Sequence, residues 1–144
     1  MQKALSGKKG FTLIEILIVM VILGLLAALV GPKMFGKVGK SRQKAAKAQI
    51  SLFETSLDTF RLDMSRYPAS DEGLEALRTK PADSEKWDGP YIPKKVPLDP
   101  WGNPYEYQLP GENGEYDLTS FGADGTAGGE DENKDIVNWK NIDE

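Results

Sequence analysis

The 144-residue sequence predicts an α+β fold in which one long N-terminal helix, transmembrane and then amphipathic, packs its outer half on a small antiparallel β-sheet. Three observations support this. A run of twenty residues from Phe11 to Val30 is almost entirely apolar, and no strong turn signal follows it until about residue 63. Apolar side chains then recur in helical steps along the second part of this stretch. Two short alternating segments between residues 105 and 121 predict a hairpin.

Composition excludes several classes of site. The chain has no cysteine and no histidine, so disulfides, thiolate zinc sites, cysteine nucleophiles and histidine-based triads are impossible. A metal site must therefore use oxygen ligands, which favours calcium or magnesium. Residues 1–47 carry a net charge of +8 and residues 99–144 a net charge of −10. We expect no nucleic-acid partner at a pI of 5.0, and the full Gly-x-x-x-x-Gly-Lys-Ser/Thr phosphate loop is absent from the sequence.

The apolar run is long enough to cross a membrane. Twenty helical residues at about 1.5 Å each span roughly 30 Å, the thickness of a bilayer core. A cleaved secretory signal is the alternative, with a site near Ala27-Ala28 and Gly31, but it would have a shorter apolar region. Gly24 and Pro32 soften or interrupt the helix, because proline removes a backbone donor. We therefore predict a helix from 11 to about 63 with a bend near 24–32.

Glu15 is the single charge inside this run. A carboxylate costs about 2.5–3.5 kcal/mol near the bilayer centre and less near an end of the span. One interpretation is a tolerated acid at the membrane interface. The other is a partner role in an assembled state, in which a cut after Gly10 creates a new amine at Phe11 that pairs with Glu15 of a neighbouring chain.

The segment Lys9-Gly10-Phe11-Thr12-Leu13-Ile14-Glu15 resembles the class III signal of the type IV pilin-like superfamily. The resemblance implies that a prepilin peptidase cleaves between Gly10 and Phe11 and methylates the amine of Phe11. It also implies that Glu15 is the assembly glutamate. Residues 1–10 would then be a cytoplasmic leader, 11–32 the transmembrane and assembly half of the stem, and 33–144 a periplasmic domain. Charge counting alone favours the opposite orientation.

The outer half of the stem shows a core-facing stripe. Its apolar positions follow steps of four and three residues, at Ala46, Ile50, Phe53, Leu57, Phe60 and Met64. Lys47, Glu54 and Asp58 are expected on the opposite, solvated face. We expect the stripe to pack the sheet onto the helix.

The globular half begins where Arg66-Tyr67-Pro68 ends the helix. A short helix is expected at 71–78, capped by Ser70 or Asp71. Residues 79–100 are proline-rich and predict an irregular loop anchored by Trp87, Tyr91 and Ile92. Strands at 105–109 and 115–121 flank a turn at 110–114.

Four ordered segments narrow the resemblance to the major pseudopilin family of type II secretion systems. They are 63–68, 72–77, 98–105 and 121–125. The resemblance implies a homopolymer, a periplasmic pseudopilus anchored in the inner membrane, that drives folded exoproteins through the outer membrane. Implied partners are minor pseudopilins, the prepilin peptidase and methyltransferase, the inner-membrane assembly platform with its motor, and membrane lipid before assembly.

Residues 122–136 form an acidic loop with five carboxylates and one lysine. Composition alone fits either a solvated loop or an oxygen cage for calcium. It is not an EF-hand, because Thr126 and Gly128 stand where that motif needs Asp or Asn. The family resemblance implies one calcium ion, held by the side chains of Asp124 and of either Asp131 or Asp135. The backbone oxygens of Phe121 and Thr126 would complete the site.

Two other classes stay open. A type IV pilin forming a surface fibre for adhesion or motility shares the N-terminal signal, although most such pilins carry a C-terminal cysteine pair that is absent here. A membrane-anchored enzyme could use Asp124 and Asp135 as an acid–base pair. No nucleophile accompanies them, so we expect no enzymatic activity.

Overall fold

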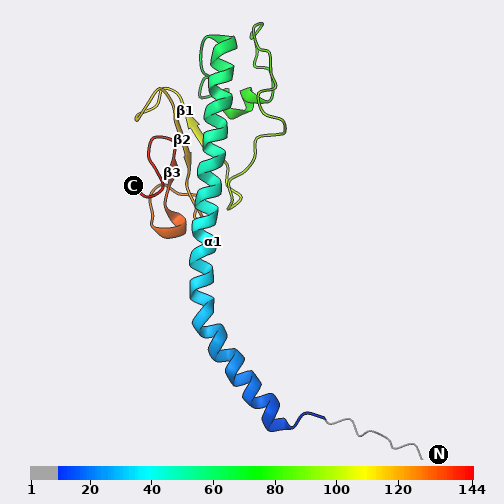
Figure 1. The fold of residues 1–144 in the computed structure, drawn as a ribbon. Helices are drawn as coiled ribbons and strands as arrows, with labels where there is room; N and C mark the ends of the chain where they lie inside the picture. The colour runs from blue at the N-terminus through cyan, green and yellow to red at the C-terminus, as the bar shows by residue number, and fades with distance from the viewer. Residues whose placement is uncertain (1–9) are drawn as a thin grey trace, which may run out of the picture. The chain divides into compact units, whose positions relative to one another are not determined.

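The computed structural model describes residues 10–144 (Figure 1). The predicted leader therefore lies outside the described residues, except for Gly10. The chain divides into two compact units, and the boundary along the sequence falls between Lys37 and Val38. The elements in chain order are α1 (Leu13–Met64), the 3₁₀ turn η1 (Leu74–Leu77), β1 (Glu106–Gln108), β2 (Asp117–Ser120), the 3₁₀ turn η2 (Asp131–Asn133) and β3 (Ile136–Val137).

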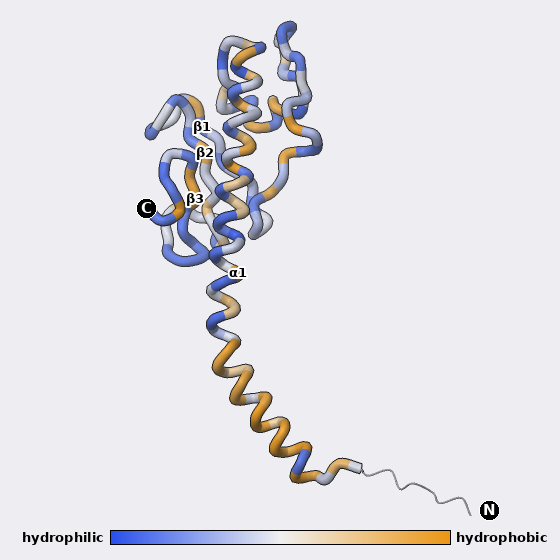
Figure 2. Tube along the Cα trace, in the orientation of Figure 1, coloured by the Kyte–Doolittle hydropathy of each residue, from blue (hydrophilic) through white to orange (hydrophobic). Residues whose placement is uncertain are grey.

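The first unit consists of the N-terminal part of α1. Among the described residues, α1 is the one helix that is long and apolar enough to span a membrane. The colouring of Figure 2 shows this apolar stretch as a nearly unbroken orange segment. The helix continues through Pro32 without interruption. The bend near Gly24 and Pro32 stays a prediction.

The second unit confirms the core stripe of the stem. Ala46, Ile50, Phe53, Leu57 and Phe60 are completely buried, and Met64 packs against the same core. Aromatic rings meet this stripe edge-on, with Phe53 and Tyr105 centroids 5.2 Å apart and Phe60 and Tyr91 centroids 5.5 Å apart. The periodicity therefore identified the face of the helix that organises the domain.

An antiparallel sheet lies along this part of α1, with the strand order β1-β2-β3 (Figure 1). Tyr107 of β1 pairs with Leu118 of β2, and both side chains are buried toward the helix. The predicted hairpin is confirmed with shorter strands. The third strand was not predicted, because two residues are too few to show an alternating pattern. Ile136 of β3 pairs with Ser120 and is 2% exposed.

The short helix expected at 71–78 is wrong in type and extent. It is the 3₁₀ turn Leu74–Leu77, because Gly73 adopts φ +59° and separates it from the preceding turn. Ser70 is no cap; its hydroxyl donates to the Leu109 carbonyl and accepts from the Leu109 N–H.

The predicted loop anchors are confirmed. Ile92 is buried, the Trp87 indole donates to the Ala76 carbonyl (2.8 Å), and the Tyr91 hydroxyl donates to Asp63 (2.8 Å). These side chains fix the proline-rich loop to the domain.

Candidate functional site

The stem begins with a capping box around the predicted assembly glutamate. The Glu15 carboxylate accepts hydrogen bonds from the Thr12 N–H (2.7 Å) and the Thr12 hydroxyl (2.9 Å). The Thr12 hydroxyl in turn accepts from the Glu15 N–H at 3.2 Å. This reciprocal pairing satisfies donors that a helix start leaves free. The sequence spacing Thr-x-x-Glu could have predicted it. Glu15 therefore has a structural role within one chain, and its pairing with a neighbour stays a prediction.

The predicted cleavage and methylation position lies just before this cap. Gly10 and Phe11 precede the helix and are exposed, Phe11 to 85%. Cleavage between them would leave the N–H of Thr12 in place, because that group belongs to the next peptide bond. The capping box is thus compatible with the mature chain that the motif implies.

The acidic loop is built from glycine-dependent turns. Gly122, Gly125, Gly128 and Gly129 all have positive φ angles, which only glycine adopts without strain. A Cβ at Gly122 would also lie 2.6 Å from the Glu132 carbonyl oxygen, so no side chain fits there. These turns fold the loop back on itself, and the Ala123 N–H donates to the Glu132 carbonyl at 2.8 Å.

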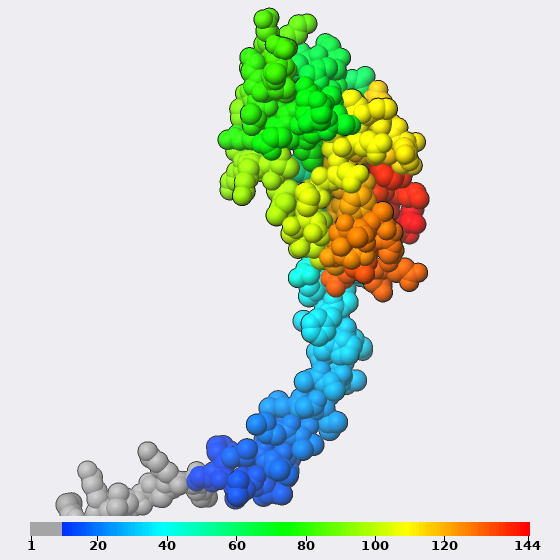
Figure 3. Space-filling view, turned by 180° about the vertical axis from the view of Figure 1, so that it is seen from behind, coloured from blue at the N-terminus to red at the C-terminus, as the bar shows by residue number. Residues whose placement is uncertain are grey.

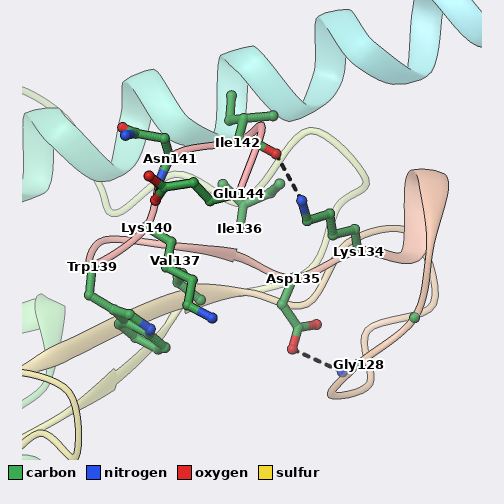
Figure 4. A pocket seen from close by; sticks show the side chains of 11 residues that line it. Gly128, Lys134, Asp135, Ile136, Val137, Trp139, Lys140, Asn141, Ile142 and Glu144 are labelled. Atoms are coloured by element: carbon green, nitrogen blue, oxygen red, sulfur yellow. Dashed lines mark hydrogen bonds between the residues drawn. The ribbon is translucent and has the colours of Figure 1, made fainter.

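Asp135 is the best-placed carboxylate of the loop for a cation. Its Oδ2 accepts from the Gly128 N–H at 2.9 Å, as Figure 4 shows. Its Oδ1 is buried and has no hydrogen-bond partner. A buried carboxylate oxygen without a donor is costly unless a cation neutralises it. The side chain lines a cavity of about 290 Å³ between the loop and the C-terminal segment.

The other predicted ligands lie around the same loop. Asp124 is exposed, and its Oδ1 accepts from the Thr126 N–H at 3.2 Å, which closes the turn. Phe121 is half-buried and follows directly after β2. Asp131 lies in η2, and its carbonyl oxygen is taken by the Gln43 side chain and the Lys134 N–H. These contacts involve the backbone of Asp131 and not its carboxylate, so the choice between Asp131 and Asp135 as the closing ligand stays a prediction, and the buried, unpartnered Oδ1 is a feature of Asp135.

No three acidic side chains of residues 10–144 come together as a metal cluster. A cation in this loop must therefore take part of its ligands from backbone carbonyls, as the predicted set does. The buried, unpartnered oxygen of Asp135 and the glycine turns fit calcium, which accepts six to eight oxygens in flexible geometry. Figure 3 shows the orange loop and the red C-terminal segment as one continuous surface of the domain.

Lys47 was expected on the solvated face and is instead bound to the C-terminal segment. Its ammonium donates to the carbonyls of Val137 (2.6 Å), Lys140 (2.8 Å) and Asn138 (3.4 Å). The lysine thus ends β3 and holds the segment that borders the cavity. Nothing in the spacing of the stem distinguishes it from an exposed lysine.

Asp99 is a second residue that sequence reasoning missed. It is 4% exposed and accepts from the N–H groups of Trp101 and Asn103 and from the Ser120 hydroxyl at 2.7 Å. Asn103 then donates to the Gly122 carbonyl at 3.0 Å. This chain of bonds connects the proline-rich loop to the first turn of the acidic loop. The Asp-Pro-x-Gly-Asn pattern could have predicted the turn.

The domain also has one ion pair with two short hydrogen bonds. The Arg66 guanidinium donates to both carboxylate oxygens of Glu72, at 2.6 and 2.9 Å. These bonds lower the pKa of Glu72, and the Ala69 N–H adds to the effect. The pair fixes the chain where it leaves α1, and it is not part of the acidic loop.

Comparison with known families covers most of the chain. The model of the type II secretion system protein G family matches residues 33–139. The model of the prokaryotic N-terminal methylation motif matches residues 5–31. The two matches adjoin at the end of the apolar run, in the order that the sequence motifs predict.

Two relatives of this chain share one name with each other. Type II secretion system core protein G of Pseudomonas aeruginosa is 47% identical over 137 residues, 93% of this chain and 96% of the relative. The Vibrio cholerae protein of that name is 46% identical over 140 residues, 95% of each chain. The crystal structure of the major pseudopilin from the type 2 secretion system of enterohaemorrhagic Escherichia coli matches with a TM-score of 0.62. It is 37% identical and covers 75% of this chain and 95% of its own. A type IV pilin is thus the less supported alternative, and the chain belongs to the family of type II secretion system protein G, the structural major pseudopilins.

Proposed function

We propose that this protein waits in the inner membrane as a single-span subunit and polymerises into a periplasmic filament that drives folded exoproteins through the outer membrane. The supporting observation is the exposed apolar stem. Large apolar side chains between Phe11 and Val38 are exposed by 46% to 89%. Such a surface is stable in lipid or against other copies of itself, and not in water.

Maturation allows the stem to move between these two environments. A prepilin peptidase would cut between Gly10 and Phe11 and methylate the new amine, as the matched methylation motif supports. In the filament, Glu15 of one subunit would neutralise the Phe11 amine of its neighbour and set the register. Lipid and stem are equally apolar, so extraction requires stem–stem contacts to replace lipid contacts.

Calcium is the proposed cofactor of the periplasmic domain. Asp124, Asp135 and the backbone oxygens of Phe121 and Thr126 would hold it, and the unpartnered Oδ1 of Asp135 supports this choice. The ion would supply a positive charge that lets the acidic loop close. Because the unfolded chain cannot bind it in this way, the bound ion stabilises the fold by mass action.

The proposed partners follow from family membership. They are other copies of this chain, minor pseudopilins, the prepilin peptidase and methyltransferase, the inner-membrane assembly platform and, before assembly, membrane lipid. We propose no catalytic role for the chain and no nucleic-acid partner. We expect the partners to contact the stem, because large apolar side chains are exposed there between Phe11 and Val38.

The processing step is tested by the mass of the protein from native membranes. We expect a chain that begins at Phe11 and carries one extra methyl group on its terminal nitrogen. A Gly10→Val variant should stay uncleaved and form no filament. Intact-protein mass spectrometry that finds residues 1–10 still attached to subunits in filaments would contradict the proposal.

A further inference from the structure

The acidic loop is held by the stem itself, at three neighbouring positions of α1. Gln43 is 8% exposed, and its side-chain amide donates to the carbonyl oxygen of Asp131. The Arg42 guanidinium lies 3.7 Å from the Glu132 carboxylate. Gly39 is buried under the same glutamate. All of these residues belong to the second compact unit.

Gly39 leaves the space that the loop occupies. A Cβ at this position would lie 2.7 Å from Cγ and 3.1 Å from Cδ of Glu132. Glycine inside a helix is about 1 kcal/mol less favourable than alanine. By contrast, a Cβ at Gly36, in the same helix, would meet nothing within 4 Å. The space at Gly39 is therefore filled by the docked loop rather than by solvent.

The docked turn η2 is tied to the rest of the loop on its other side. The Glu132 carbonyl accepts from the Ala123 N–H at 2.8 Å, next to Gly122. Lys134 N–H donates to the Asp131 carbonyl at 3.2 Å, and Asp135 follows directly. Asp131 and Glu132 thus contact the stem on one side and the beginning and end of the acidic loop on the other. A displacement of η2 from the stem must move the backbone that carries Asp135.

We propose that Gly39 and Gln43 are positioning residues for the cation-binding loop, so that cation binding and the order of stem residues 39–46 are coupled. The inference rests on the calcium site proposed above. Gln43 is the principal residue, because removing a buried donor leaves the Asp131 carbonyl with only one partner. The Arg42–Glu132 pair is half-exposed on both sides and contributes little. Coupling is reciprocal: if the stem stabilises the loaded loop, the loaded loop stabilises the stem by the same factor.

The test uses the full chain in detergent micelles and calcium chloride as the probe. Calcium affinity is measured by calorimetric titration for the native protein, Gln43→Met and Gly39→Leu. Matched controls are Gln49→Met, on the same helix, and Gly36→Leu, where space is open. We expect Gln43→Met and Gly39→Leu to weaken calcium binding about tenfold, a typical coupling factor. The two controls should bind calcium as the native protein does.

A second readout separates coupling from simple loss of stability. Amide hydrogen exchange at residues 39–46 should slow when calcium is added to the native protein and should respond much less in Gln43→Met. A general destabilisation would change exchange equally with and without calcium.

The outcomes distinguish this inference from the calcium proposal. If the native protein binds no calcium, both the calcium site and the coupling are refuted. If it binds calcium while all four variants bind equally well, and exchange at 39–46 ignores the ion, the coupling is refuted and the calcium site stands. Weakened binding in the controls as well as in Gln43→Met and Gly39→Leu would also refute it, because the effect would not be specific to the docking positions.

Discussion

Replacing Lys47 by methionine tests how the C-terminal segment is held. Methionine keeps most of the side-chain length and removes the ammonium, which donates to three carbonyls at 2.6, 2.8 and 3.4 Å. A hydrogen bond from a charged group contributes about 1.5–3 kcal/mol. The Lys140 carbonyl is exposed and can bond to water instead. The net loss of unfolding free energy should therefore be about 2 kcal/mol, near the lower end for one strong bond.

For a domain of this size, about 2 kcal/mol lowers the Tm by on the order of 10 °C. The assay is thermal and urea unfolding of the full chain in detergent, followed by near-ultraviolet circular dichroism of the aromatic core. Lys44→Met is the control, because Lys44 is exposed on the same helix. It should change the unfolding free energy by less than about 0.5 kcal/mol. Equal unfolding curves for Lys47→Met and Lys44→Met would refute the role given to Lys47.

Three further predictions follow from the core and the loop. Chelation should lower the Tm of the native chain, and Asp135→Asn should abolish that response; a variant that still responds to chelator would contradict the assigned ligand. Burial raises the pKa of Tyr105, Tyr107 and Tyr116. In the unfolded chain these tyrosines ionise near the ordinary tyrosine pKa of about 10. The folded domain should therefore keep its full stability below that pH and lose stability as the pH rises above it. Their phenolate absorbance should appear together with unfolding, and smooth titration of all tyrosines in a folded domain would refute this. Phe53→Ala should cost about 3–5 kcal/mol, since this ring is fully buried; a loss below about 1 kcal/mol in urea unfolding would argue against the stripe as the core.

The elements that sequence reasoning predicted correctly are those whose pattern repeats. The core stripe of α1 shows five intervals of helical spacing, and its positions from Ala46 to Phe60 are all buried as expected. The long apolar helix and the hairpin also show a simple pattern over several residues. The family resemblance then supplied the candidate calcium ligands. Composition alone could not define how these ligands are arranged around the acidic loop.

The features that were missed depend on single long-range contacts. In the sequence, Lys47 cannot be distinguished from a surface lysine. The three carbonyls that it binds belong to residues about ninety positions further along the chain. β3 is two residues long, and Gly39 looks like a weak point of the helix until Glu132 is placed against it. The sequence likewise does not show that Asp135 has a buried carboxylate oxygen without a hydrogen-bond partner. No local pattern encodes contacts of this kind.

We propose that the apolar stem is stable both in lipid and in a polymer, and that the charge of Glu15 is needed for polymerisation. The structure allows this charge to be separated from helix capping. Glu15→Gln keeps an acceptor for the Thr12 N–H and removes the charge, whereas Thr12→Ala weakens the cap and keeps the charge. The decisive measurement is the yield of sedimentable polymer from membranes that contain equal amounts of each cleaved variant. We predict that Glu15→Gln inserts normally and forms almost no polymer, while Thr12→Ala polymerises. Equal polymer from Glu15→Gln and the native chain would contradict the account.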